Sequence, residues 1–425
     1  MRHWSYSRRQ TIRRTSAALF SLFILLRPGL SWSGEVTGSV TVGYDSYSEN
    51  YSFVQAPALT ELSEIRTRLT LGYTTGMLLK DYFHIEGQSL IGEESVESMG
   101  RANLAYRFGG TRVTFDNALS YRKFHDSSIY LFANDFWRYD LRSTLKQAIG
   151  SNVIVGVTHR LEVINFAQRT EFDLDYKRNG IELSADIDNG FTSSYRATAG
   201  YVDKTIPDST GISYGAVVGG LEYRHTFGLN RQIYLTVDAE RRTYADLGAR
   251  SPFWSTYATA NIQPITIHRF GIAFENVFES YQYDRTTQVF FNYVENRMAL
   301  QALYFQSILF KIGVGPTYGF LRSGVSLEDE YTEVGAKVSV DYSSGRRLWL
   351  SASWEPGRRD YKLESVTADL IFSDFVYHRL LLFSTLRLWG NASVNVFANI
   401  EPEDHKVPTD DSTTTLLSAD ATYRF

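Results

Sequence analysis

The sequence predicts an all-β protein, an antiparallel transmembrane β-barrel of about 20 strands (roughly 18–22) without a soluble plug domain. Three observations predict it. Apolar and polar residues alternate along nearly the whole chain, which is the period of β-strands. Aromatic residues make up 15% of the 425 residues, and there is no cysteine. After the N-terminal region no run of about 18 apolar residues occurs, so no transmembrane helix is expected.

The N-terminal region has the pattern of an export signal. Five arginines precede an apolar run, Ala17–Leu26, whose ten residues are too few to span a bilayer as a helix. Ser31 and Ser33 then provide small residues before Gly34, as a signal-peptide cleavage site requires. We expect residues 1–33 to be a cleaved signal peptide and residues 34–425 to form the barrel.

The segment Met99–Phe124 shows the strand pattern most clearly, as a complete hairpin. Apolar residues alternate with polar ones on both sides of Gly109-Gly110, and two glycines tolerate the positive φ angles of a two-residue turn. Such a turn pairs Leu104 with Phe115, on an apolar face. It also sets Arg107 opposite Arg112 on the other face, where like charges destabilise a sheet. The remaining chain repeats this hairpin, with the apolar face toward lipid and the charged face toward water.

Connections of two lengths separate the expected strands, as transmembrane barrels require. The expected strands include one at Phe166–Lys177 and one at Tyr361–Phe372. Three acidic stretches, residues 92–98, 327–333 and 401–411, are expected to be solvated loops. The expected short turns are Gly109-Gly110, Ile149–Asn152, Arg178–Gly180 and Gly228–Asn230, and the expected long loops are Ser46–Ser63, Phe124–Asn134, Tyr244–Ser251, Arg322–Glu330 and Glu401–Ser412.

The last strand adds evidence on location. Leu417, Ala419, Ala421, Tyr423 and Phe425 share one face, and the chain ends on phenylalanine. This ending resembles the assembly signal of bacterial outer-membrane proteins, with Tyr423 and Phe425 as its aromatic residues, although Asp420 stands where glycine is common. The resemblance is to porin-like barrels as a class. It implies Sec export to the outer membrane, contact with lipid and lipopolysaccharide, and recognition by the barrel-assembly machinery.

The polar face carries two charged sectors. A basic sector is followed along the chain by an acidic one, so the two should be neighbours in an up-and-down barrel. In a water-filled channel they would produce a transverse field that orients solutes and biases ion selectivity; alternatively, the charges only pair across strands and solvate the interior. The expected pore-lining residues are Arg66, Arg68, Arg101, Arg107, Arg112, Arg122, Arg138 and Arg142 on the basic side, and Glu171, Asp173, Asp175, Glu182 and Asp186 on the acidic side.

Other chemistry is not indicated by the sequence. No two of the eight histidines have the spacing of metal ligands, and no nucleophile, phosphate-binding or dinucleotide motif is present. His159 and His225 share the parity of apolar residues, which predicts positions near a membrane interface. The net charge of −4 gives no reason to expect nucleic acid. We therefore expect no enzyme activity, cofactor or metal.

Three functions remain open from the sequence. The first is an outer-membrane channel for passive diffusion or export of small hydrophilic solutes. The second is a barrel that serves as scaffold or conduit for a periplasmic or lumenal partner, in exopolysaccharide export or as the sheath of an electron-transfer protein. The third is a secreted, soluble β-protein.

Overall fold

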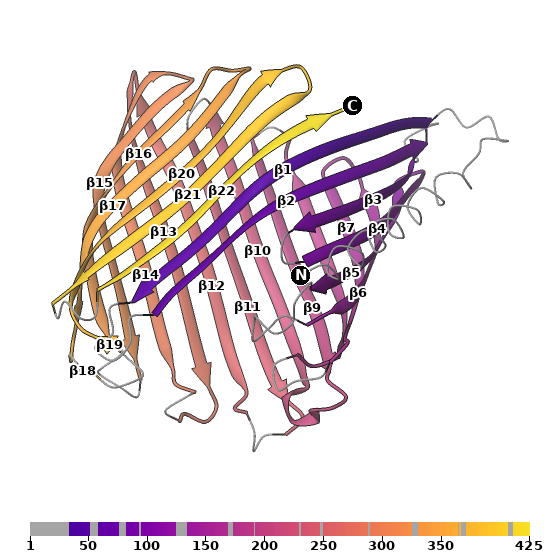
Figure 1. Cartoon of the computed structure of the whole chain (residues 1–425), viewed down its shortest axis with the longest axis horizontal. Helices are drawn as coiled ribbons and strands as arrows, with labels where there is room; N and C mark the ends of the chain where they lie inside the picture. The colour runs from indigo at the N-terminus through magenta and orange to yellow at the C-terminus, as the bar shows by residue number, and fades with distance from the viewer. Residues whose placement is uncertain are drawn as a thin grey trace, which may run out of the picture.

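The computed structural model forms a single barrel wall of tilted strands (Figure 1). It describes residues 34–51, 58–75, 82–92, 95–124, 134–168, 173–190, 192–228, 231–246, 250–287, 290–324, 330–363, 365–366, 371–406 and 411–425. The expected signal peptide, residues 1–33, lies outside these ranges. Within them no helix is long and apolar enough to cross a membrane.

Twenty strands form the main sheet, and two short ones form a separate pair, β18 and β19. In order, the elements are β1 (Gly34–Tyr51), β2 (Ala58–Thr75), β3 (Tyr82–Gly92), β4 (Ser95–Phe108), β5 (Thr111–Phe124), β6 (Phe136–Ile149), β7 (Val153–Phe166), β8 (Tyr176–Asp188), β9 (Ser193–Thr205), η1 (Thr210–Ile212), β10 (Tyr214–Gly228), β11 (Arg231–Tyr244), β12 (Phe253–Ile267), β13 (Phe270–Tyr283), β14 (Tyr293–Ser307), β15 (Phe310–Ser323), β16 (Tyr331–Ser343), β17 (Leu348–Tyr361), β18 (Ser365–Val366), β19 (Ile371–Phe372), β20 (Phe375–Trp389), β21 (Ala392–His405) and β22 (Ser412–Arg424).

The sheet closes on itself between its first and last strands. Each main strand pairs antiparallel with its neighbours in the chain, and β1 pairs with both β2 and β22. Gly38 and Phe425 exchange two backbone hydrogen bonds of 2.9 Å at this seam. Closure leaves no free sheet edge, which is what allows strands to cross a hydrocarbon layer. The expected barrel and its strand number are confirmed.

The outer face of the barrel is apolar. Alternate residues of nearly every strand are large hydrophobic side chains that remain exposed, for example Leu104, Leu183 and Leu221, the last with 63% of its surface accessible. A water-soluble protein rarely exposes a contiguous apolar surface of this extent, whereas a lipid-embedded barrel requires one. The interpretation as a secreted soluble protein is therefore wrong.

The two ends of the barrel differ in the length of their connections. At one end, which we call the turn end, strands are joined by two to four residues, apart from β2 and β3. At the other, the loop end, the connections have six to thirteen residues, apart from β3 and β4. The described ends of the chain, Gly34 and Phe425, both lie at the turn end, and the C-terminus is marked at the upper edge of the barrel in Figure 1. This alternation is typical of transmembrane barrels.

The hairpin of β4 and β5 has the expected register. Leu104 pairs with Phe115 and Arg107 with Arg112 around the Gly109-Gly110 turn. Gly109 adopts a φ of 55°, which its missing side chain permits.

Several expected boundaries are wrong. Residues 176–188 form one strand, so there is no turn at Arg178–Gly180. The expected strand Phe166–Lys177 is also wrong, because β7 ends at Phe166 and β8 begins at Tyr176. β17 runs without a break to Tyr361, and only short pieces of strand follow it before β20. Parts of all three acidic stretches, at the starts of β4 and β16 and the end of β21, also belong to strands. β1 and β2 extend into the expected loop Ser46–Ser63. Strand pairing on both sides overrides these local loop signals.

Asparagine or aspartate side chains close several connections at the loop end. The backbone N–H of the last residue of a strand donates to a carboxylate just before the next strand, as from Phe124 to Asp135 and from Phe166 to Asp175. The same contact joins Tyr361 to Asp374. Each connection thereby satisfies a backbone donor that has no strand partner.

One loop-end carboxylate is held by an arginine. The Arg241 guanidinium contacts Asp284 through two hydrogen bonds of 2.8 and 2.5 Å and lowers the pKa of this exposed carboxyl. A lowered pKa contributes stability that is present above the ordinary pKa of aspartate and is lost as the pH falls through the lowered one.

Candidate functional site in the barrel lumen

The arginines of the expected basic sector project from the inner face of the barrel. On each strand they alternate with the exposed hydrophobic residues of the outer face, so their side chains point the other way. The strands that carry them are neighbours in the wall, apart from β3 between β2 and β4. Arg66 and Arg68 come from β2, Arg101 and Arg107 from β4, Arg112 and Arg122 from β5, and Arg138 and Arg142 from β6.

Some of these arginines are neutralised by nearby acids. Arg66 contacts Asp45 at 3.0 Å and Glu64 at 2.8 Å, and Arg101 contacts Asp116 at 2.8 Å. Arg138 contacts Asp140 at 2.8 Å and Glu162 at 3.1 Å. These pairs agree with the alternative in which interior charges compensate one another across strands.

Three other arginines of this sector have no such acidic partner. Arg68, Arg112 and Arg142 make no ion pair with any residue that the structure describes. Arg112 lies between Arg107 on β4 and Lys146 on β6 in the strand register. Arg142 lies between Arg160 on β7 and Asp116 on β5, and Asp116 is paired with Arg101. Such like-charge neighbours destabilise a sheet unless water or a bound anion screens them. The inner wall here is therefore positive beyond its internal pairing.

The acidic sector differs from the expected set. Glu182 and Asp186 lie on the inner face of β8, where Lys146 contacts Asp186 at 3.0 Å and Arg160 contacts Glu182 at 3.4 Å. Asp173 and Asp175 are not in a strand: they precede β8 at the loop end, where Asp173 accepts a hydrogen bond from Asn134 and Asp175 is buried. Glu171 lies outside the described residues.

Further acids on the inner wall were missed by the sequence analysis. Strand parity would have found them once the strand boundaries were known. They continue the acidic sector along the wall, interspersed with Arg196, Arg224 and Arg242. The inner-face carboxylates on these strands are Glu222 on β10, Asp238 and Glu240 on β11, and Glu275 and Glu279 on β13.

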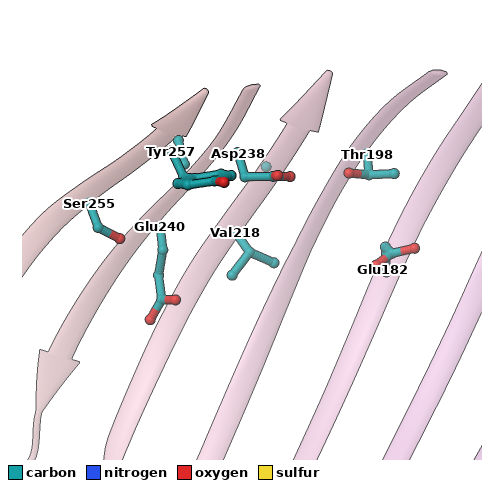
Figure 2. Close-up of a pocket in the computed structure, with 9 residues that line it drawn as sticks. Glu182, Thr198, Val218, Asp238, Glu240, Ser255 and Tyr257 are labelled. Atoms are coloured by element: carbon teal, nitrogen blue, oxygen red, sulfur yellow. The ribbon is translucent and has the colours of Figure 1, made fainter. Parts of the chain in front are cut away.

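A recess of about 340 Å³ opens in this acidic wall (Figure 2). Glu182, Asp238 and Glu240 contribute carboxylates to its lining, and Thr198, Ser255 and Tyr257 contribute hydroxyl groups. Glu240 is paired with Arg242 at 2.6 Å, whereas Asp238 makes no ion pair among the described residues. The lining can therefore accept hydrogen bonds from, and attract, a positively charged or hydroxyl-bearing group.

Missing side chains account for the hollow. Gly200 on β9 and Gly220 on β10 occupy inner-face positions beside the recess. A methyl group on Gly220 would lie 2.8 Å from both the Asp238 carboxylate and the Thr198 hydroxyl. Alanine at this position would therefore displace two of the polar groups that line the recess.

A cluster of closely paired charges lies on β14 to β21, in contrast to the acidic recess. Glu333 is only 3% exposed and accepts from Arg359 at 2.8 Å and Arg379 at 3.1 Å, with Arg297 at 3.6 Å. Arg379 also pairs with Glu401. The charges of this cluster are largely paired within the protein, so we interpret the cluster as a group that stabilises the wall.

Aromatic rings reinforce the inner face at the loop end. The Arg359 guanidinium lies 4.1 Å from the ring of Tyr331 and 5.0 Å from that of Phe375, and the Arg379 guanidinium lies 4.1 Å from Tyr377. Tyr331 and Phe375 are the first residues of β16 and β20. They fill the lumen side of the wall, in addition to the aromatic residues of the outer face.

The described residues contain no group of histidine, cysteine, aspartate and glutamate side chains that could hold a metal ion. Tyr423 and Phe425, the residues of the expected assembly signal, are exposed on the outer side of the barrel seam. Their recognition by assembly machinery stays a prediction.

Comparison with known proteins supports the fold. No family model matches the sequence, and no curated protein sequence is significantly similar to it. The ferric citrate transporter FecA shares the fold with a TM-score of 0.53 at 9% identity, over 93% of this chain and 79% of that one. The siderophore receptor PirA from Acinetobacter baumannii gives 0.52 at 8% identity, over 93% and 81%. The outer membrane protein OpdK from Pseudomonas aeruginosa gives 0.49 at 12% identity, over 92% and 99%.

At these identities the likeness concerns the fold alone. The closed wall, the apolar exterior and the alternation of short and long connections are those of an outer-membrane-type β-barrel. The chain is therefore a transmembrane barrel of the bacterial outer-membrane class.

Proposed function

We propose that the protein is a channel through which small hydrophilic solutes cross the outer membrane by diffusion. The observation that carries this proposal is the inner wall, where arginines without ion-pair partners on β2 to β6 stand beside an acidic recess on β8 to β12. Charges that served only to stabilise the wall would be paired, as they are around Glu333. Unpaired charges of both signs instead suit an aqueous path for charged or dipolar solutes.

The orientation follows from the connections. Short turns of outer-membrane barrels lie in the periplasm and long loops outside the cell. Arg112, close to the Gly109-Gly110 turn, then lies near the periplasmic mouth, and Arg142 lies near the middle of the wall. The cationic part of a dipolar solute would be drawn to the recess around Asp238 and its anionic part to these arginines.

Conductance of the purified protein in planar lipid bilayers tests this function. We expect discrete steps of ion current that scale with salt concentration, because a charged, polar lumen holds water. Folded protein that inserts without any current would contradict an open channel and would favour the alternative in which the barrel surrounds a partner. Heat-modifiable mobility in gels provides the control for folding.

Ion selectivity tests the role of the two charged sectors. The double variant Arg112→Glu and Arg142→Glu should raise the cation-to-anion permeability ratio severalfold, whereas Asp238→Asn should lower it, since each changes the local lumenal potential in one direction. Reversal potentials under a salt gradient measure both effects. Lys123→Glu is the matched control, because Lys123 is on β5 but on its outer face. Equal reversal potentials in all variants would exclude these residues from the ion path.

A further inference from the structure

The outer face of β5 to β8 carries polar side chains where lipid is expected. His159 is the seventh of the fourteen residues of β7, with Val157 and Leu161 as its neighbours on the same face. The sequence predicted a position near the membrane interface, and the structure places this histidine in the middle of the strand instead. An ionisable side chain at that depth on a lipid-facing surface is costly, and such residues commonly mark functional sites.

Four more polar residues lie on the outer face of β5, β6 and β8 near His159. Ser143 on β6 is its direct partner in the strand register, and His159 Nε2 lies 2.7 Å from Asn179 Oδ1 on β8. The hydroxyl of Tyr139 donates to Asn117 Oδ1 at 3.0 Å. We call Asn117, Tyr139, Ser143, His159 and Asn179 the outer polar patch.

The patch lies within the apolar band of the barrel rather than at its edge. Toward the turn end it is bordered by Leu145, Val157 and Leu183, with exposed fractions of 47, 42 and 57%. Toward the loop end it is bordered by Leu119 and Trp137, which are also exposed. The polar groups therefore lie at a depth where the surrounding side chains are hydrophobic and suited to contact with lipid chains.

The two internal hydrogen bonds leave part of the patch unsatisfied. Among the described residues, the Ser143 hydroxyl and the side-chain NH₂ groups of Asn117 and Asn179 have no hydrogen-bond partner, and one imidazole nitrogen of His159 is unused. Lipid chains offer neither donors nor acceptors, so each exposed group is destabilising in a bilayer. A protein surface that provides both would remove this penalty.

We propose that the outer polar patch is the interface at which two copies of this chain form a dimer in the membrane. Both copies insert in the same direction, so a two-fold axis must run along the membrane normal, and side chains at equal depth then meet. The patch contains donors and acceptors together, which makes it complementary to itself, as a two-fold interface requires. Its central residues, Ser143 and His159, lie closest to the axis.

Cross-linking through an introduced thiol tests the dimer. The chain contains no cysteine, so Ser143→Cys creates its only thiol. Oxidation of membranes that contain this variant should give a disulfide-linked species of twice the chain mass. Ala258→Cys, on the outer face of β12, is the matched control and should stay monomeric. Folded Ser143→Cys protein that remains monomeric, or that joins a protein of another mass, would overturn the proposal.

A measurement without cysteine gives an independent answer. Light scattering of the unmodified protein in mild detergent should show two chains per particle, and the double variant Asn117→Leu and His159→Leu should raise the dimer dissociation constant at least tenfold. Monomeric unmodified protein would reject the interface. Single-channel conductance should persist in the monomeric variant, because the patch is outside the lumen, so failure of the dimer leaves the channel proposal separately testable.

Discussion

Replacement of Glu333 with alanine is expected to destabilise the barrel by about 3–5 kcal/mol. The carboxylate is nearly inaccessible and is the shared acceptor of Arg359 and Arg379, with Arg297 nearby. Its removal leaves buried guanidinium groups without their counter-charge. Since these arginines come from β14, β17 and β20, the loss would affect five consecutive strands of the wall (β14 to β17 and β20) rather than one hairpin.

Urea-induced unfolding in lipid vesicles, followed by tryptophan fluorescence and by gel mobility, measures this effect. Asp360→Ala is the control, because both side chains of the Arg358–Asp360 pair are exposed to solvent and such pairs contribute only about 0–1 kcal/mol. Equal unfolding midpoints for the two variants would show that the Glu333 cluster does not stabilise the wall.

Replacement of Gly315 with alanine is expected to impair barrel assembly. A Cβ atom at this position would lie 1.8 Å from the backbone carbonyl oxygen of Leu300 and 2.8 Å from the Cα of Gln301. Backbone cannot rotate away as a side chain can, so β14 and β15 would have to separate locally. Overpacking of this kind typically costs about 1–3 kcal/mol or more.

The fraction of heat-modifiable, folded protein in the membrane measures this defect. Gly219→Ala is the matched control, since its nearest contact would be an ordinary one of 3.6 Å to the Thr198 carbonyl oxygen. Folded yields that are alike for both variants would show that the wall can adjust at Gly315.

The local sequence pattern predicted most of the wall because strand parity is a local property. In the hairpin around Gly109-Gly110, a two-residue turn fixes the register, and the register then decides which side chains face lipid and which face the lumen. The Arg107–Arg112 pair followed directly from this reasoning.

The pattern misled where a turn signal lies within a strand. Asn179-Gly180 has the composition of a hairpin turn. In the structure Gly180 is in the middle of the wall, paired with Arg160 on β7 and Val202 on β9. Asp175, assigned from its parity to a pore-lining strand, instead accepts a hydrogen bond from the Phe166 backbone at the loop end. An acidic or amide residue followed by an aromatic one, as in Asp135-Phe136, is the signal that marks such strand starts.

By itself, the sequence determined the fold class, the apolar exterior and the inward direction of most charged side chains, because each depends on residues two apart in one strand. Only the tertiary structure decided which of the charges are paired. Glu333 is neutralised by arginines from other strands, Arg112 and Arg142 make no ion pair among the described residues, and the acidic recess is lined by residues of β8 to β12. Such contacts depend on the registers of several strands together, and closure of the barrel sets them only when all twenty strands are in place.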